Sequence, residues 1–295
     1  MKKGSLYVLA CFIVAGNALL AQGTAKKNFK SAEQSVRLST GVDMNYVEQG
    51  DANGIPVILL HGFTDSWHSF EKVLQHLPAS LHVFAVSQRG HGNSSKHEKN
   101  YHPEDFAKDI AAFIQQKKLG PSVIVGHSMG STNAQCFAAN YPSLTRALVL
   151  VASFSDFKKP LIEEFKKTID ELIDPIDSVF IAEFQKSTIV KPIDNAVLNG
   201  FINESLKVPA HVWKGVAAGW GTSDFSKALK SFHKPALIMW GDKDAYSPRE
   251  DQYVLNSSLK NSRLLVYEGI GHALHWEEPE RFAADLAAFV KNPDK

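Results

Sequence analysis

The pentapeptide GHSMG at residues 126–130 is the segment whose residue types and spacing predict chemistry most directly. It has the G-x-S-x-G pattern, in which a serine occupies a sharp turn between a strand and a helix and its hydroxyl oxygen projects from the chain. An apolar run at 122–125 comes directly before it, and a helical pattern follows. Because small flanking residues tolerate the crowding of such a turn, we predict that Ser128 is a nucleophile.

A serine hydroxyl attacks effectively only when a base removes its proton, and His272 is the predicted base. It follows an apolar strand pattern at 263–267 and a short turn. That position lies at the carboxyl edge of the sheet, where catalytic groups of open α/β sheets gather. His275 is the nearby rival, but it lies further from the strand end, and we expect it to pack or cap there.

The base needs a carboxylate that holds its tautomer and stabilises the imidazolium. Asp242 and Asp244 are both candidates, because both follow the strand pattern at 236–240. We expect Asp242 to stabilise the turn and Asp244, deeper in the loop, to reach His272. Serine, aspartate and histidine then follow one another in an order that is known for such triads.

The negative charge that forms on the substrate oxygen needs hydrogen-bond donors, usually two backbone N–H groups. Met129, the residue after the nucleophile, is expected to supply one. The loop after the apolar run at 55–60 is expected to supply the other from Phe63, with Gly62 permitting a tight turn. We expect His61 to form hydrogen bonds within this loop and to take no part in chemistry.

Strand and helix patterns that alternate along the chain predict an α/β fold with a mostly parallel, doubly wound sheet. Strands are expected at 35–38, 42–48, 55–60, 81–86, 123–125, 146–152, 236–240 and 263–267, and helices at 66–76, 103–118, 134–140 and 279–290. Between residues 153 and 232 the strand pattern stops and helical patterns broken by prolines replace it. We therefore predict a core of residues 31–152 and 233–295 with an inserted helical cap at 153–232.

The cap segment is rich in phenylalanine and tryptophan, which indicates a largely apolar ligand site. Most of these rings are expected to pack the cap onto the core. The residues expected to contact a small apolar substrate are Phe63, Trp67, Phe154 and Trp213. The histidines lack metal-ligand spacing and no phosphate-binding glycine loop is present, so we predict neither a metal nor a cofactor.

The N-terminus reads as a secretory signal peptide over residues 1–21: two lysines, an apolar run and a small residue near the expected cleavage point. We predict an exported protein, periplasmic or secreted, without a stable membrane anchor. After cleavage Cys136 is the only cysteine, which rules out an intramolecular disulfide, and its apolar surroundings predict a buried core residue. The net charge of +1 gives no indication of a nucleic-acid partner, and the oligomeric state is left open.

Five segments resemble the α/β-hydrolase superfamily, and the resemblance extends from about Val42 to Lys291: HGFTDSW (61–67), QRGHGNSS (88–95), GHSMGS (126–131), WGDKDAYSP (240–248) and GHALHWEEP (271–279). They resemble its cap-bearing branch of esterases, epoxide hydrolases, haloalkane dehalogenases, C–C bond hydrolases and cofactor-free haloperoxidases. The resemblance implies Asp244 as the acid and His272 as the base. Because epoxide hydrolases and dehalogenases attack with aspartate, Ser128 argues against both of those activities.

The expected function is therefore hydrolysis of a small, mostly apolar carboxylic ester or lactone through an acyl-enzyme, with a small molecule as the only expected partner. Two alternatives stay open. One is a C–C bond hydrolase or cofactor-free perhydrolase that uses the same triad. The other is a ligand receptor with slow turnover, which export disfavours because its partner would have to lie outside the cytoplasm.

Overall fold

The computed structural model of the protein describes residues 32–221 and 224–293, so the predicted signal peptide lies outside the described residues. In this part of the chain eight strands form one sheet in the order β1-β2-β4-β3-β5-β6-β7-β8. β2 pairs antiparallel with β1 and β4, and the other neighbours are parallel. The strands are β1 (Gln34–Arg37), β2 (Asp43–Gly50), β3 (Ile55–Leu60), β4 (Leu81–Ser87), β5 (Ser122–His127), β6 (Thr145–Val151), β7 (Ala236–Gly241) and β8 (Ser262–Tyr267).

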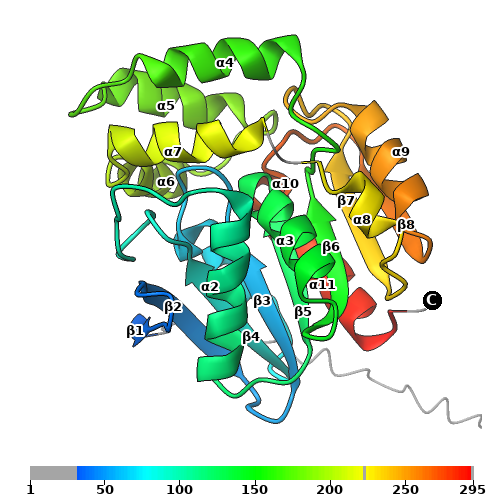
Figure 1. The fold of residues 1–295 in the computed structure, drawn as a ribbon. Helices are drawn as coiled ribbons and strands as arrows, with labels where there is room; N and C mark the ends of the chain where they lie inside the picture. The colour runs from blue at the N-terminus through cyan, green and yellow to red at the C-terminus, as the bar shows by residue number, and fades with distance from the viewer. Residues whose placement is uncertain (1–31, 222–223, 294–295) are drawn as a thin grey trace, which may run out of the picture.

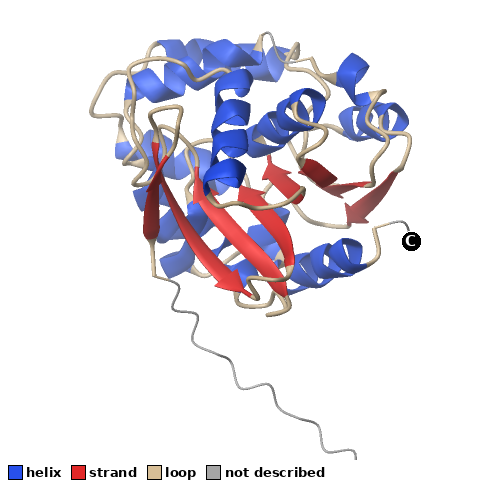
Figure 2. Cartoon of the chain, turned by 60° about the horizontal axis from the view of Figure 1, so that its bottom comes forward, coloured by secondary structure: helices blue, strands red, loops and turns tan. Residues whose placement is uncertain are grey.

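Helices cover both faces of this sheet, as Figures 1 and 2 show. Alternate side chains of each strand point to opposite faces. Val57 and Leu59 of β3 pack into one core with α1 (Glu71–Leu74) and α11 (Pro279–Lys291). Ile58 and Leu60 pack into the other with α2 (Pro103–Gln116), α3 (Met129–Asn140) and α9 (Arg249–Ser258). This architecture confirms the predicted fold class.

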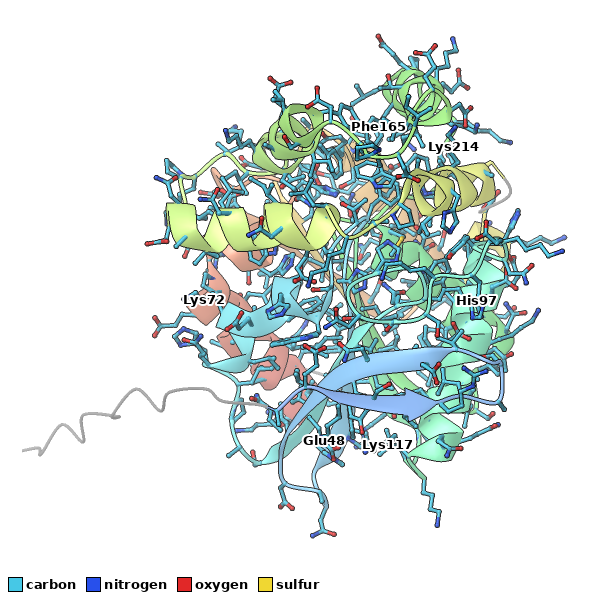
Figure 3. The ribbon with its side chains drawn as sticks, turned by 90° about the vertical axis from the view of Figure 1, so that its left-hand side faces the viewer. Glu48, Lys72, His97, Lys117, Phe165 and Lys214 are labelled. Carbon is cyan, nitrogen blue, oxygen red and sulfur yellow. The ribbon has the colours of Figure 1, made fainter. Side chains whose placement is uncertain are left out.

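Four helices between β6 and β7 lie together over the carboxyl ends of the parallel strands, at the top of Figure 1. We call α4 (Pro160–Asp170), α5 (Ser178–Ser187), α6 (Asn195–Ser205) and α7 (Ala210–Trp220) the helical insertion. Phe165 of α4 points into its interior, toward Phe184 and Trp220 (Figure 3). The short helix α8 (Ser226–Leu229) packs against α3 and α9 instead.

Two helix predictions need correction. The helix expected at 66–76 is a 3-10 turn, η1 (Trp67–Phe70), followed by the single turn of α1, because Ser66 caps η1 and Pro78 follows closely. The helix that was expected to follow the pentapeptide and to continue through 134–140 begins inside the pentapeptide, at Met129. Its first turn contains residues of low helix propensity, and their complete burial against the sheet outweighs that preference.

Buried and half-buried ion pairs fix the connections around the sheet. Arg89, after β4, forms a bidentate pair with Asp109 of α2, with N–O distances of 2.6 and 2.7 Å, and both side chains are buried. Glu48 and Lys117 form a pair of 2.9 Å that joins β2 to the end of α2 (Figure 3). Among the described helices, none is both long and apolar enough to cross a lipid bilayer.

Candidate active site

Ser128 occupies the turn between β5 and α3 in a strained conformation, with φ +52° and ψ −116°. The chain can pass through this turn only because the residues two positions away on each side, Gly126 and Gly130, lack side chains. A Cβ on Gly126 would lie 2.1 Å from the carbonyl oxygen of Gly130, and a Cβ on Gly130 would lie 2.3 Å from that of Leu60. The surrounding backbone therefore holds the serine in this conformation, which is the usual condition for strain at a functional turn.

The side chains of Ser128, His272 and Asp244 form one continuous chain of hydrogen bonds. His272 Nε2 lies 2.8 Å from Ser128 Oγ, and His272 Nδ1 lies 2.8 Å from Asp244 Oδ2. All three residues follow strand ends, β5, β8 and β7, at the same edge of the sheet. A general base needs this arrangement: one ring nitrogen on the hydroxyl and the other held by a carboxylate.

The loop after β7 holds Asp244 as a buried, ionised carboxylate. Its Oδ1 accepts hydrogen bonds from the N–H groups of Tyr246, at 2.8 Å, and Ser247, at 3.0 Å. Burial by itself raises the pKa of Asp244, but the attraction of His272 and the hydrogen bonds from His272 and Ser247 outweigh it and leave the pKa below its usual value. Asp242 instead accepts the N–H of Gly269, at 2.6 Å, and closes the turn.

Two further histidines lie beside the base. His275, the rival candidate, bonds to Ser69 Oγ at 2.9 Å and packs against Phe70. His127 directly precedes the nucleophile, and its Nε2 lies 3.1 Å from the carbonyl oxygen of His272. Burial lowers the pKa of both rings, that of His127 to about 3, so both are neutral.

Backbone N–H groups of Phe63 and Met129 border the site. In the described part of the chain neither group donates to another protein atom, and both residues line the cavity over Ser128. The Phe63 loop is fixed by His61, whose Nδ1 donates to the carbonyl of Gly62 at 2.8 Å and whose Nε2 accepts the N–H of Gln88 at 2.9 Å. The two free donors have the position that an oxyanion hole requires, one directly after the nucleophile and one on the β3 loop.

The cavity over Ser128 is mostly aromatic. The helical insertion and the segment before it supply one wall, and the loops that carry the candidate triad supply the floor. The lining residues are Phe63, Asp65, His127, Ser128, Met129, Phe154, Phe157, Ile162, Phe165, Phe184, Gln185, Thr188, Trp220, Tyr246, His272 and Trp276.

Two residues that were expected to contact the substrate, Trp67 and Trp213, lie outside this lining. Trp67 packs into the core beside α1, where its indole N–H donates to Glu33 at 3.1 Å. Trp213 is fully buried inside the insertion and packs edge-on against Phe63, with ring centroids 4.8 Å apart. It therefore supports Phe63 from behind. Phe63 and Phe154, the other two, do line the cavity.

Three polar residues of the lining, Asp65, Gln185 and Thr188, were not predicted. Burial raises the pKa of Asp65 to about 7, although Gln185 and Ser69 donate hydrogen bonds to it. Because Asp65 comes two residues after Phe63, its place in the sequence could have indicated that it lies near the site. Gln185 and Thr188 come from α5 and its end, where a polar residue in an amphipathic helix gives no indication of a site.

The loop that carries His272 is attached to the insertion. Glu277 of α10 (Leu274–Glu277) accepts the N–H groups of Gly271, at 2.9 Å, and Lys191, at 2.7 Å. The N–H of Ala273 donates to the carbonyl of Thr188 at 2.9 Å. The backbone on both sides of the base is therefore held by the segment that follows α5.

Comparison with known proteins identifies the family. The model of the α/β hydrolase fold family matches residues 55–279. The chain belongs to this family. This hydrolase is 37% identical over 275 residues to the 2-(acetamidomethylene)succinate hydrolase of Mesorhizobium japonicum, and the alignment covers 84% of this chain and 92% of that one.

The hydrolase is also 26% identical over 282 residues to a bifunctional esterase/perhydrolase of Acinetobacter calcoaceticus, covering 87% of this chain and 99% of the relative. The solved structure of an esterase from Exiguobacterium antarcticum has the same fold, with a TM-score of 0.80 at 24% identity, covering 88% of this chain and 100% of that one.

Two sequence predictions about reactive groups concern places outside this site. Cys136 is completely buried in α3, and burial raises the pKa of its thiol to about 12, so it is a core residue. Within the described ranges, no group of three or more histidine, cysteine or acidic side chains is arranged to hold a metal ion.

Proposed function

We propose that this hydrolase cleaves a small, mostly apolar carboxylic ester or lactone through an acyl-enzyme on Ser128. The observation that carries the proposal is the unbroken chain of two 2.8 Å contacts from Ser128 through His272 to Asp244, at the base of an aromatic cavity. Two free backbone donors border the same cavity. Together they supply the nucleophile, base, acid and oxyanion stabilisation that acyl transfer needs.

In the first half of the proposed reaction, Ser128 Oγ attacks the carbonyl carbon while its proton passes to His272 Nε2. Asp244 stabilises the imidazolium, and the N–H groups of Phe63 and Met129 stabilise the oxyanion. The intermediate collapses as His272 returns the proton to the leaving alkoxide, so an alcohol departs and an acyl-serine remains. In the second half, His272 takes a proton from water as the water oxygen attacks the acyl carbon. The tetrahedral intermediate then collapses as His272 returns that proton to Ser128 Oγ, which releases the acid and restores the serine.

The chemistry of the lining supports an uncharged substrate. Among the residues that line the cavity none is a lysine or arginine, and Asp65 is the acidic group that faces it apart from the triad. The name of the Mesorhizobium relative contains a dicarboxylate, 2-(acetamidomethylene)succinate. In this cavity such a dicarboxylate would find no lysine or arginine to pair with. We therefore propose a neutral ester for this chain, with its apolar part against the phenylalanines.

Hydrolysis of p-nitrophenyl acetate and butyrate by the wild type and by Ser128→Ala tests the proposal. We expect turnover by the wild type, a loss of at least about 10³-fold in the variant, and labelling of Ser128 by a fluorophosphonate. His272→Ala should retain the nucleophile and lose turnover. The proposal fails if the wild type neither hydrolyses these esters nor accepts the label, or if Ser128→Ala keeps its rate.

Perhydrolysis is a second candidate, which the likeness to the Acinetobacter esterase/perhydrolase favours. Hydrogen peroxide would replace water as the acceptor of the acyl group, so that acetate and peroxide give peracetic acid through the same acyl-serine. Peracid formation from acetate and peroxide, compared in the wild type and Ser128→Ala, tests it. We also propose export, which cell fractionation and N-terminal sequencing of the mature protein would test.

A further inference from the structure

One side of the aromatic cavity carries a buried carboxyl group, that of Asp65, which has no cationic partner in the described part of the chain. Asp65 is 3% exposed and lines the cavity. Its Oδ1 accepts from Gln185 Nε2 at 3.1 Å, and its Oδ2 accepts from Ser69 Oγ at 3.2 Å. Both contacts are long, and each carboxylate oxygen can accept more than one hydrogen bond. Burial of a carboxylate that has only these two hydrogen bonds costs free energy, so the position of Asp65 calls for a functional explanation.

Gln185 is held in place by the core and the insertion together. Its Nε2 also lies 2.6 Å from Ser205 Oγ of α6 and 3.3 Å from Thr64 Oγ1. A carboxylate only accepts hydrogen bonds, which requires the amide nitrogen of Gln185 to face Asp65. The polar side of the cavity is thus fixed before any ligand enters.

A buried acceptor that has no hydrogen-bond partner in the described residues lies close to Asp65. His127 Nε2 faces the carbonyl oxygen of His272 at 3.1 Å, and because a carbonyl cannot donate, Nε2 must carry the proton of the neutral ring. Nδ1 is then a bare acceptor. His127 is 3% exposed, and within the described residues its Nδ1 has no hydrogen-bond partner. Nδ1 itself is sealed from the cavity, so the acceptor that a ligand can reach on this side is the carboxylate of Asp65.

The space between these two acceptors is left open by Gly62. A Cβ at that position would lie 2.7 Å from His127 Nδ1 and 3.1 Å from Asp65 Oδ2. Gly62 is not among the glycines with positive φ, so its backbone conformation is open to any residue. What requires glycine here is the space, since any side chain at this position would press against both acceptors.

We propose that Asp65 and Gln185 form a subsite that binds a hydroxyl or amide N–H group on the acyl part of the substrate. The inference rests on the proposed function and narrows it: the substrate is an ester of a hydroxy- or acylamino-substituted acid, with its hydrocarbon part against the aromatic wall. The acyl part is the part concerned because it stays on Ser128, in the cavity that Asp65 also lines. Substituents on the departing alcohol are not held there.

Matched esters at pH 8, above the pKa of about 7 for Asp65, test the subsite. The pairs compare p-nitrophenyl butyrate with its 2- and 3-hydroxy derivatives and with its 3-acetylamino derivative. We expect kcat/KM of the wild type to favour at least one donor-bearing ester by roughly 10- to 100-fold, the discrimination typical of a buried polar site. Asp65→Asn, which keeps the shape of the side chain, should lower that ratio by at least about tenfold.

Asp65→Leu should remove the preference completely, and thermal unfolding shows whether each variant folds. Phe157→Leu, on the aromatic wall, is the matched control: it should alter all these esters by a similar factor. The subsite is refuted if the wild type hydrolyses butyrate and the substituted esters equally, or if the preference survives in Asp65→Asn.

Failure of the proposed function would look different, because no ester would be turned over and Ser128 would stay unlabelled. The subsite then remains measurable by binding. In Ser128→Ala, 3-hydroxybutanamide should raise the midpoint of thermal unfolding more than butanamide does, and the difference should disappear in the double variant with Asp65→Asn. Equal shifts for the two amides would overturn the inference.

Discussion

Replacement of Asp244 by asparagine tests the triad most sharply, because the structure determines how the new amide must lie. Oδ1 accepts two backbone N–H groups, from Tyr246 and Ser247, so the amide oxygen has to take that position. The amide nitrogen then replaces Oδ2, 2.8 Å from His272 Nδ1. An N–H donor there requires Nδ1 to accept, which moves the ring proton to Nε2, the nitrogen that must accept the proton of Ser128.

The imidazole is then in the tautomer that cannot act as a base, while every heavy atom stays close to its place. The same replacement in the Ser-His-Asp triad of serine proteases lowers kcat by about 10⁴-fold. At 1.36 kcal/mol per factor of ten, that corresponds to about 5 kcal/mol of lost transition-state stabilisation. We expect a loss of that size for Asp244→Asn on p-nitrophenyl butyrate, visible in kcat, with KM within a few-fold of the wild type.

Asp242→Asn is the matched control, two residues away in the same turn. Its side-chain oxygen can still accept the N–H of Gly269, so kcat/KM should stay within about threefold of the wild type. Thermal unfolding of both variants separates catalytic loss from loss of folded protein. A folded Asp244→Asn variant that retains more than about a tenth of the wild-type kcat would show that Asp244 does not set the tautomer of His272.

Three further predictions concern groups around the site. Asp109→Ala leaves the buried guanidinium of Arg89 without its carboxylate and should lower the free energy of unfolding in urea by about 3–5 kcal/mol; a smaller change would mean that water reaches the pair. Asp65 has a folded pKa of about 7, above the ordinary 3.8, so the free energy of unfolding of the wild type should fall as pH rises between these two values. In urea titrations, the free energy of unfolding of Asp65→Asn relative to that of the wild type should therefore rise by at most about 4 kcal/mol between pH 4 and pH 8. Above pH 8 the difference should stay constant. Glu277→Leu leaves the N–H groups that Glu277 accepts beside His272 without a partner, and it should lower the free energy of unfolding by at least about 2 kcal/mol. The same variant should lose more in kcat than in the rate at which a fluorophosphonate labels Ser128. Glu277→Gln, which keeps an acceptor, should recover part of the stability and part of kcat.

The residues of the candidate triad could be picked out because they follow strands whose patterns are unambiguous. β5, β7 and β8, which precede Ser128, Asp244 and His272, each contain an uninterrupted apolar run, and a parallel sheet brings their carboxyl ends to one edge. Position along the chain therefore translates directly into position in space. The preference for Asp244 over Asp242 needed only the extra reach of two residues into the loop.

The substrate wall could not be derived in the same way. A helix that packs between a core and a cavity has apolar residues all round, so periodicity does not tell which ring faces the ligand. Trp213 and Trp220 both lie on α7, yet Trp220 lines the cavity and Trp213 packs behind Phe63. Gln185 was missed for a related reason: its partners, Asp65 and Ser205, are brought together only by the tertiary fold.

The helical insertion covers the site and also forms hydrogen bonds to the residues and loops that make it up. On one side Gln185 of α5 donates to Asp65, beside the Phe63 donor of the β3 loop. On the other side, backbone N–H and C=O groups after α5 are bonded to the loop of His272, through Thr188 and Glu277. Since unpaired buried backbone groups are costly, these bonds hold the insertion and the base in one arrangement. The end of α5 and the segment that follows it therefore contact both the polar side of the cavity and the loop that carries the base. A change in this part of the insertion is expected to alter substrate choice and the alignment of His272 together.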